Sequence, residues 1–238
     1  MTIKTEFLSY TDQGTHLEAF VATPDQKKKM PLVLLCHAWK GRDDFIMEKA
    51  LSVAKLGYIG FAIDMYGKGV LGKSSIESAL LKKPFLEDRD FLLKRTLAGL
   101  TQALRLDLAD VGQVVVVGYG FGAICALDLA RSGAMLKGVI SVYGHFLPPE
   151  KKCMQPSKTQ FLVLHGLDDP IVPKEELLAF EREMKEAQAD LQLHLFSNTM
   201  HAFATPGAND PAAGIAYNPL SAARAWELTH RFLDKLFS

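Results

Sequence analysis

Continuous apolar runs alternate along the chain with stretches in which apolar residues recur every three or four positions. An uninterrupted apolar run of roughly four to eight residues is typical of a strand buried on both faces of a parallel sheet. Recurrence at three or four positions indicates an amphipathic helix. The pattern predicts strands at residues 31–36, 58–63, 114–117, 137–142, 161–165 and 191–196. It predicts helices at residues 44–55, at two segments within 75–107 that separate near Pro84, and at 121–131, 174–187 and 220–236.

Two further strands precede this alternation. Residues 3–10 and 16–22 flank the turn at 11–14 and predict an antiparallel hairpin at a sheet edge. Strands that alternate with helices predict a mostly parallel central sheet with helices on both faces, which is the α/β class. No internal repeat, low-complexity tract or linker interrupts residues 1–238, so we expect a single domain.

The segment 118–122 reads Gly-Tyr-Gly-Phe-Gly and joins the strand at 114–117 to the helix at 121–131. A turn patterned Gly-x-nucleophile-x-Gly between a strand and a helix is the nucleophile elbow, which lifts one reactive side chain above a parallel sheet. Gly120 occupies the nucleophile position, so the reactive atom is missing.

The same glycines also fit the dinucleotide-binding pattern Gly-x-Gly-x-x-Gly/Ala. That pattern needs a carboxylate about 20 residues further on, at the end of the next strand, to bind the ribose. The strand at 137–142 is followed by no Asp or Glu before Glu150, and the motif lies after two buried strands rather than in the first strand–helix unit. We therefore favour the elbow.

Two later loops supply the partners that an elbow nucleophile requires. The strand at 161–165 runs into Asp168 and Asp169, and the strand at 191–196 runs into His201. The chain order of nucleophile, acid and histidine, each at the carboxyl end of a strand, is that of an α/β-hydrolase triad.

These motifs resemble the dienelactone hydrolase family of α/β-hydrolases. The elbow of that family usually reads Gly-Tyr-Cys-Phe-Gly, so Gly120 stands where the catalytic cysteine belongs. The resemblance implies an α/β-hydrolase fold and hydrolysis of carboxylic esters or lactones. The segments that carry it span most of the chain and are residues 36–43, 61–69, 118–130, 165–170 and 200–203.

The resemblance also implies roles for single residues. Asp169 becomes the triad acid because the family's acid directly precedes an x-x-Val-Pro segment, here residues 170–173, and Asp168 is the alternative. His201 becomes the base. The oxyanion hole would consist of the backbone N–H groups of Phe121 and of Trp39 or Ala38. The residues expected at the substrate are His37, which would shape the oxyanion loop, Ala38, Lys68 and Tyr119.

Three positions depart from the family. Ala38 replaces a glutamate that helps control the thiolate, and Lys68 and Thr205 replace arginines that hold the substrate carboxylate. Lysine is a point charge rather than a bidentate fork, and threonine carries no charge. We therefore do not expect dienelactone itself to be the substrate.

Composition limits the partners and the location. Lys plus Arg and Asp plus Glu number 27 each, so the balanced charge indicates neither nucleic acid nor an anionic membrane as partner. Three cysteines make no disulfide framework, and the N-terminus lacks a signal-peptide pattern. No apolar run approaches the length of a membrane span. We expect a cytoplasmic monomer or homodimer that acts on a small-molecule ester or lactone, without a cofactor and without a metal, since no histidine–carboxylate cluster has ligand spacing.

Gly120 leaves two hypotheses open. In the first, the chain is an ester or lactone hydrolase whose activity is reduced or lost because Gly120 has no nucleophile, or in which His201 activates water directly. In the second, it is a non-catalytic relative that binds a small carbonyl or carboxylate ligand in the same cleft. Cys36 and Cys125 are not expected to replace the nucleophile, because a reactive thiolate needs exposure and both lie in apolar surroundings.

Overall fold

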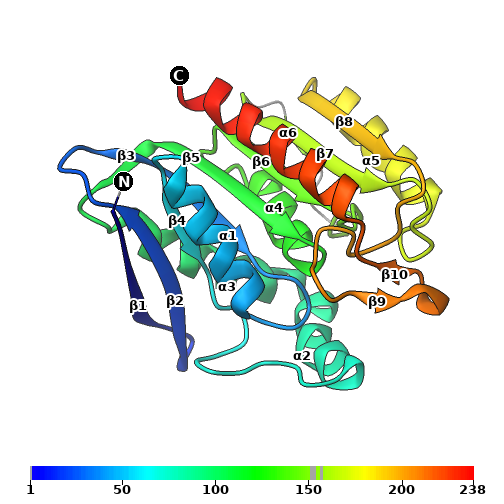
Figure 1. Cartoon of the computed structure of the whole chain (residues 1–238), viewed down its shortest axis with the longest axis horizontal. Helices are drawn as coiled ribbons and strands as arrows, with labels where there is room; N and C mark the ends of the chain where they lie inside the picture. The colour runs from blue at the N-terminus through cyan, green and yellow to red at the C-terminus, as the bar shows by residue number, and fades with distance from the viewer. Residues whose placement is uncertain (1, 151–153, 156–157) are drawn as a thin grey trace.

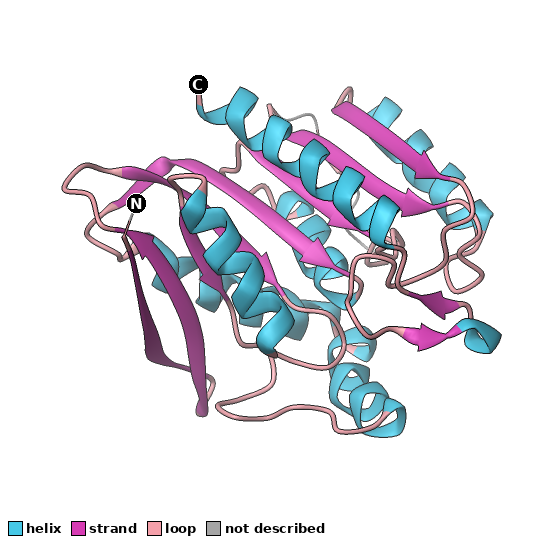
Figure 2. Ribbon diagram, viewed as in Figure 1, coloured by secondary structure: helices cyan, strands magenta, loops and turns pink. Residues whose placement is uncertain are grey.

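The computed structural model describes residues 2–150, 154–155 and 158–238, and these residues form an eight-stranded and a two-stranded sheet (Figures 1 and 2). The strands are β1 (Ile3–Asp12), β2 (Thr15–Pro24), β3 (Met30–Cys36), β4 (Ile59–Ala62), β5 (Ala109–Tyr119), β6 (Gly138–Val142), β7 (Gln160–Gly166), β8 (Asp190–Phe196), β9 (Asn209–Asp210) and β10 (Ile215–Ala216). The helices are α1 (Asp44–Lys55), α2 (Ser75–Glu87), α3 (Arg89–Leu104), α4 (Phe121–Arg131), α5 (Lys174–Glu186) and α6 (Pro219–Phe237), with a 3₁₀ turn, η1 (Pro211–Ala213).

The large sheet has the strand order β1-β2-β4-β3-β5-β6-β7-β8. The pairs β1–β2 and β2–β4 are antiparallel, and every pair from β4 to β8 is parallel. The predicted edge hairpin is confirmed as β1–β2. Its turn residues Gln13 and Gly14 have φ values of 46° and 80°, which match the right-handed twist of the strands.

Helices cover both faces of the sheet. Side chains of α1 and α6 join one buried cluster, and side chains of α3, α4 and α5 join the cluster on the opposite face. In Figure 1, α1 and α6 cross in front of the strands and α4 lies behind them. A mostly parallel sheet between two helical layers is therefore confirmed. None of the described helices is both long and apolar enough to cross a bilayer.

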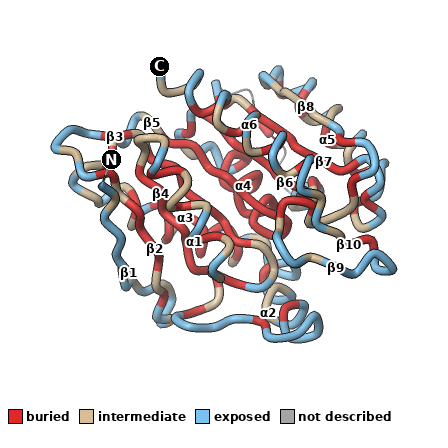
Figure 3. The backbone as a smooth tube through the Cα atoms, in the orientation of Figure 1, coloured by how far each residue is buried: buried red, intermediate tan, exposed pale blue. Residues whose placement is uncertain are grey.

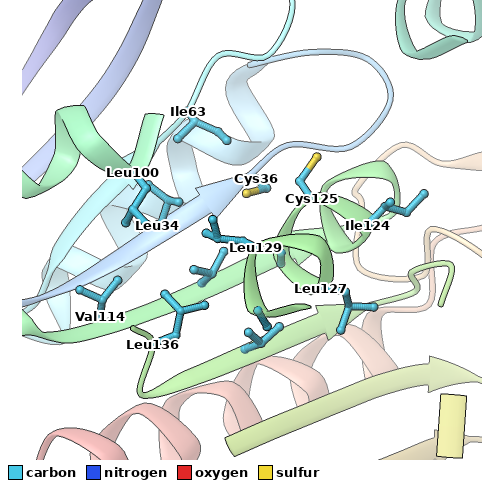
Figure 4. Packing of buried hydrophobic residues seen from close by; sticks show 14 of the residues in the cluster. Leu34, Cys36, Ile63, Leu100, Val114, Ile124, Cys125, Leu127, Leu129 and Leu136 are labelled. Carbon is cyan, nitrogen blue, oxygen red and sulfur yellow. The ribbon is translucent and has the colours of Figure 1, made fainter. Parts of the chain in front are cut away.

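Successive side chains of the central strands point to opposite faces of the sheet, and this divides the core into these two clusters. Leu34 and Cys36 of β3 point into the cluster around α4, and Leu35 between them points into the cluster around α1 and α6. Figure 4 shows Leu34 and Cys36 beside α4, and Figure 3 shows that the central strands are buried over most of their length. A strand buried on both faces has no polar positions, which explains the continuous apolar runs in the sequence.

The structure corrects the predicted break near Pro84. α2 continues through Pro84 to Glu87, because a proline in the last turn removes only one helical hydrogen bond. The chain breaks at Asp88 instead. The extended backbone of Asp88 ends α2, and its side chain accepts a hydrogen bond from the Phe91 N–H at 2.8 Å to begin α3.

The carboxyl ends of the parallel strands lie along one edge of the sheet. β5 leads into Gly120, β6 into Tyr143, β7 into Asp169 and β8 into the loop that contains His201. In open parallel sheets this edge is where ligands bind.

Candidate active site

The turn between β5 and α4 has the geometry of a nucleophile elbow. Gly120 lies between the two elements with φ 53° and ψ −111°, and its N–H donates to the Val142 carbonyl at 3.0 Å. Gly122 allows α4 to approach β3, because a Cβ there would lie 2.1 Å from the Cys36 carbonyl oxygen. The central residue of this turn has a positive φ, which glycine adopts without strain, and it carries no side chain.

Tyr143 closes the space above Gly120. A Cβ on residue 120 would lie 3.2 Å from Tyr143 Cε2 and 3.8 Å from the Ala38 Cβ, so the tyrosine ring would have to give by a few tenths of an ångström. The ring is held in place, because its hydroxyl shares a 2.7 Å hydrogen bond with Thr205 Oγ1 and its face meets Phe203 edge-on. Tyr143 itself adopts φ 42°, which is unfavourable for a residue with a Cβ.

His201 and Asp169 form a hydrogen-bonded pair on the same cleft. His201 Nδ1 lies 2.8 Å from Asp169 Oδ2, and the other oxygen, Oδ1, accepts the N–H groups of Ile171 at 2.8 Å and Val172 at 3.2 Å. The Asp169 side chain is fully buried. Burial alone would raise the pKa of Asp169, but the hydrogen bond from His201, the charge of that ring and the Ile171 N–H outweigh it and hold the pKa below its usual value. Asp168 is exposed, and its N–H donates to the Thr199 carbonyl.

A small hairpin that the sequence did not reveal holds the backbone of His201. The His201 N–H donates to the Gly214 carbonyl at 3.0 Å, and its carbonyl accepts the Ala216 N–H at 3.1 Å. Gly214 and Ala216 belong to the β9–η1–β10 segment, in which β9 and β10 pair over two residues each. A strand of two residues leaves no hydrophobic period to detect, so the sequence pattern gives no sign of β9 or β10.

The elbow and the histidine both face a cleft of 1020 Å³. Its walls contain Gly120, Phe121 and His201, together with Ala38 and Trp39 from the loop after β3. The cleft is also lined by Tyr143, His145, Leu147, Lys82, Leu86, Thr205, Ala213 and Ile215. Five of the residues predicted from the sequence therefore meet at one surface.

Two predicted residues lie beneath the cleft rather than in its wall. His37 has no exposed surface; its Nε2 accepts the Met65 N–H at 3.2 Å, so its Nδ1–H donates to the Ala38 carbonyl at 2.7 Å. Burial lowers the pKa of His37. Tyr119 is buried as well and packs edge-on against the Phe45 ring. Both residues support the loops of the site without contacting its open space.

Lys68 lies outside the set of residues that line the cleft. Its Nζ forms a 2.7 Å ion pair with Glu18, and 61% of its side chain is exposed. A different cation reaches the cleft: Lys82 of α2 lines it, with Nζ 5.4 Å from the centre of the Trp39 ring. Burial lowers the pKa of Lys82. The loop that carries Lys68 turns toward β2, which spacing along the chain could not reveal.

Neither described cysteine reaches the cleft. Cys36 and Cys125 have no exposed surface, and Figure 4 shows both sulfurs among apolar side chains. Burial raises the pKa of both thiols, that of Cys125 to about 12. A thiol in this setting stays protonated and unreactive at neutral pH. Cys153 lies outside the described residues, and within those residues no three His, Cys, Asp or Glu side chains come together as a metal site would require.

One family model, a curated protein and solved structures are similar to most of this chain. A family model described as the dienelactone hydrolase family matches residues 17–237. A Bradyrhizobium protein named "Probable 2-oxo-3-(5-oxofuran-2-ylidene)propanoate lactonase" is 25% identical over 98% of this chain and 96% of its own length. A solved structure named m3DLH is 30% identical, covers 99% of both chains and has a TM-score of 0.91. A structure described as a dienelactone hydrolase-like promiscuous phosphotriesterase from metagenomic libraries is 26% identical over 99% of both chains, with a TM-score of 0.89.

Proposed function

The chain belongs to the dienelactone hydrolase family, and we propose that it hydrolyses carboxylic esters or lactones with a water molecule in place of the missing nucleophile. One observation carries the proposal: the His201–Asp169 pair, with its 2.8 Å hydrogen bond, faces the same cleft as the elbow glycine, Gly120. The lactonase name of the Bradyrhizobium relative supports the lactone part of the substrate class.

His201 is the proposed base. The Nδ1 of His201 is bonded to the Asp169 carboxylate, so the Nδ1–H tautomer is favoured and the lone pair of Nε2 is free to take a proton. A water molecule beside Gly120 would lose that proton as its oxygen attacks the ester carbonyl carbon. The buried carboxylate then stabilises the imidazolium that forms.

The proposed oxyanion hole lies at the start of α4. The N–H of Phe121 belongs to the first turn of that helix, where backbone N–H groups have no acceptor within the helix. The second donor would be the N–H of Trp39 or of Ala38, both of which line the cleft. Two such donors stabilise the charge that develops on the carbonyl oxygen.

Without a covalent intermediate the reaction must be slow. Removing the nucleophile from a comparable triad costs on the order of 10⁶ in rate, and an oxyanion hole with substrate binding retains roughly 10³–10⁴ over water. We therefore expect turnover far below that of a cysteine enzyme but dependent on His201.

A second candidate is a binding protein for a small carbonyl or carboxylate ligand. The position of Tyr143 favours it, because the ring lies 3.2 Å from where a nucleophile's Cβ would be and so partly fills the space of that side chain. Lys82 in the cleft wall would attract a carboxylate. The free thiols of Cys36 and Cys125 support the cytoplasm as the setting for either function.

Hydrolysis of 4-nitrophenyl butyrate separates the two candidates. We expect slow turnover by the chain and background rates for His201→Ala. His230→Ala is the matched control, because His230 also lies beside a carboxylate, that of Asp234 at 3.2 Å, but on α6 and away from the cleft. If His201→Ala equals the unaltered chain in rate while butyrate binds to both in calorimetry, the binding protein is the correct description.

A further inference from the structure

A second histidine–carboxylate pair faces the cleft beside the first. His145, in the loop after β6, lines the cleft, and its Nδ1 lies 3.4 Å from Glu176 Oε2 in the first turn of α5. The ring centres of His145 and His201 are 6.4 Å apart. The side chain of His145 is 29% exposed, whereas that of Glu176 is 5% exposed. The carboxylate is thus behind the imidazole, and the imidazole faces the open space.

The two carboxylates are held in the same way. Glu176 Oε1 accepts the N–H groups of two consecutive residues, Phe146 and Leu147, while Oε2 meets His145 Nδ1. Asp169 likewise accepts two consecutive N–H groups with one oxygen and His201 Nδ1 with the other. In both pairs the acid binds Nδ1, which leaves Nε2 as the nitrogen available to a ligand.

The loop after β6 does not need His145 as an anchor. Arg131 donates to the Phe146 carbonyl at 2.6 Å, and Arg89 donates to the Leu147 carbonyl at 3.1 Å. Both arginines are fixed by the buried Asp128 carboxylate. With the N–H groups on Glu176 Oε1 and the carbonyls on arginines, the loop backbone is held from both sides, and the contact between His145 and Oε2 orients the imidazole.

We propose that His145 is a second catalytic residue, which donates a proton to the leaving oxygen of the ester or lactone while His201 removes one from water. The proposal rests on the hydrolytic function proposed above. Two rings 6.4 Å apart can contact opposite sides of one reacting carbonyl group. A base and an acid in separate positions suit direct attack by water, because neither ring has to move between the two proton transfers.

The proton transfers balance. The proposed step requires His145 to start as the imidazolium and His201 to start as the neutral ring. The water oxygen bonds to the carbonyl carbon as His201 Nε2 takes a water proton, and the bond from that carbon to the alkoxy oxygen breaks as His145 Nε2 delivers its proton to the alkoxy oxygen. The products are the carboxylic acid and the alcohol. Solvent in the open cleft returns the proton from His201 to His145.

This arrangement extends the substrate class to esters with poor leaving groups. An alkoxide needs a proton as it departs, whereas 4-nitrophenolate leaves without one. The His145 acid therefore serves alkyl esters and aliphatic lactones, whereas aryl and enol esters are hydrolysed without its help.

The test compares two leaving groups on one acyl group. We would measure kcat/KM for ethyl butyrate and for 4-nitrophenyl butyrate with the unaltered chain, His145→Gln and the control His230→Gln. General acid catalysis contributes about 10²–10⁴-fold. We expect His145→Gln to lower the rate on ethyl butyrate by at least about 10²-fold and on 4-nitrophenyl butyrate by less than about 3-fold. His230→Gln should leave both rates unchanged.

Equal losses on both esters would show a structural role and overturn the proposal, as would an unchanged rate on ethyl butyrate. Slow reactions are followed as product accumulated over long incubations at high enzyme concentration, and the same two outcomes decide. Failure of the underlying hydrolysis is recognised separately, because His201→Ala would then leave the rates of the glycine chain on both esters unchanged.

Discussion

Gly120 and His201 face the same cleft from turns that are built differently. The elbow consists almost entirely of backbone: φ 53° at Gly120, a hydrogen bond to Val142 and a close approach of α4 to β3 through Gly122. The His201 side of the cleft depends on side chains, since His201 and Asp169 lie in two different loops and must form their 2.8 Å hydrogen bond between them. The backbone of the elbow does not need a nucleophile in order to form, whereas the histidine pair does not form without its carboxylate.

This difference would account for a proposed site that lacks a reactive atom while its other parts are in place. A glycine at the elbow adopts the positive φ without strain, so losing the nucleophilic side chain is expected to stabilise the folded state. No comparable gain follows from removing Asp169, because its loss leaves two backbone N–H groups, those of Ile171 and Val172, without their acceptor. Four variants test this contrast.

The largest effect is expected from Gly120→Cys, which supplies the side chain that the elbow lacks. We expect kcat/KM for 4-nitrophenyl butyrate to rise by about 10⁴-fold or more, given the roughly 10⁶-fold cost of removing a triad nucleophile. A second change, His201→Ala, should abolish the gain. Gly133→Cys is the matched control, since Gly133 also has a positive φ but no atom within 4 Å of its Cβ position. A folded Gly120→Cys protein that stays as slow as the original would refute the elbow assignment.

The role of the His201–Asp169 pair is tested by Asp169→Asn in the Gly120→Cys background. We expect a loss of about 10²–10⁴-fold in kcat, because asparagine can hold the ring in the wrong tautomer and cannot stabilise the imidazolium. Asp168→Asn should change kcat by less than about 3-fold, since that side chain is exposed and the hydrogen bond to His201 comes from Asp169. Equal losses in the two variants would mean that the acid has been misassigned.

A stability measurement separates strain from crowding at the elbow. Gly120→Ala should lower the free energy of unfolding by about 1–3 kcal/mol through its positive φ. Gly133→Ala also places a methyl group at a positive φ, but in open space, so it gives the reference loss for a site without the 3.2 Å contact with Tyr143. Chemical denaturation of both variants gives the two values. A smaller loss for Gly120→Ala than for Gly133→Ala would show that Tyr143 does not fill the space.

The smallest effect concerns a buried histidine behind the acid. Burial outweighs the nearby Asp169 charge and lowers the pKa of His165 in the folded state, so the unfolded chain takes up the proton first as the pH falls. Stability should be unaffected above the unfolded pKa, about 6.5, and should fall as the pH drops from there toward the folded pKa. His165→Phe should flatten the slope of the unfolding free energy against pH between pH 7 and pH 5. An unchanged slope, as expected for the control His230→Gln, would contradict the shift.

The sequence predicts most of the fold because the central strands are buried on both faces and so read as apolar runs. It also predicts the elbow and the His201 and Asp169 positions, since the carboxyl ends of parallel strands meet at one edge. It fails where contacts depend on the path of a loop: Lys68 pairs with Glu18 instead of reaching the cleft. It likewise fails for His145, which follows β6 just as His201 follows β8, because its partner Glu176 lies on a helix and nothing local indicates the pairing.

The β9–η1–β10 hairpin around Gly214 both lines the cleft and supports the backbone of His201. Ala213 and Ile215 line the cleft, while the hydrogen bonds of Gly214 and Ala216 hold the backbone of His201. An engineer who enlarges the cleft at Ile215 would therefore also shift His201, the proposed base. Redesign of substrate preference should begin at Leu86 of α2, which also lines the cleft but does not belong to this hairpin.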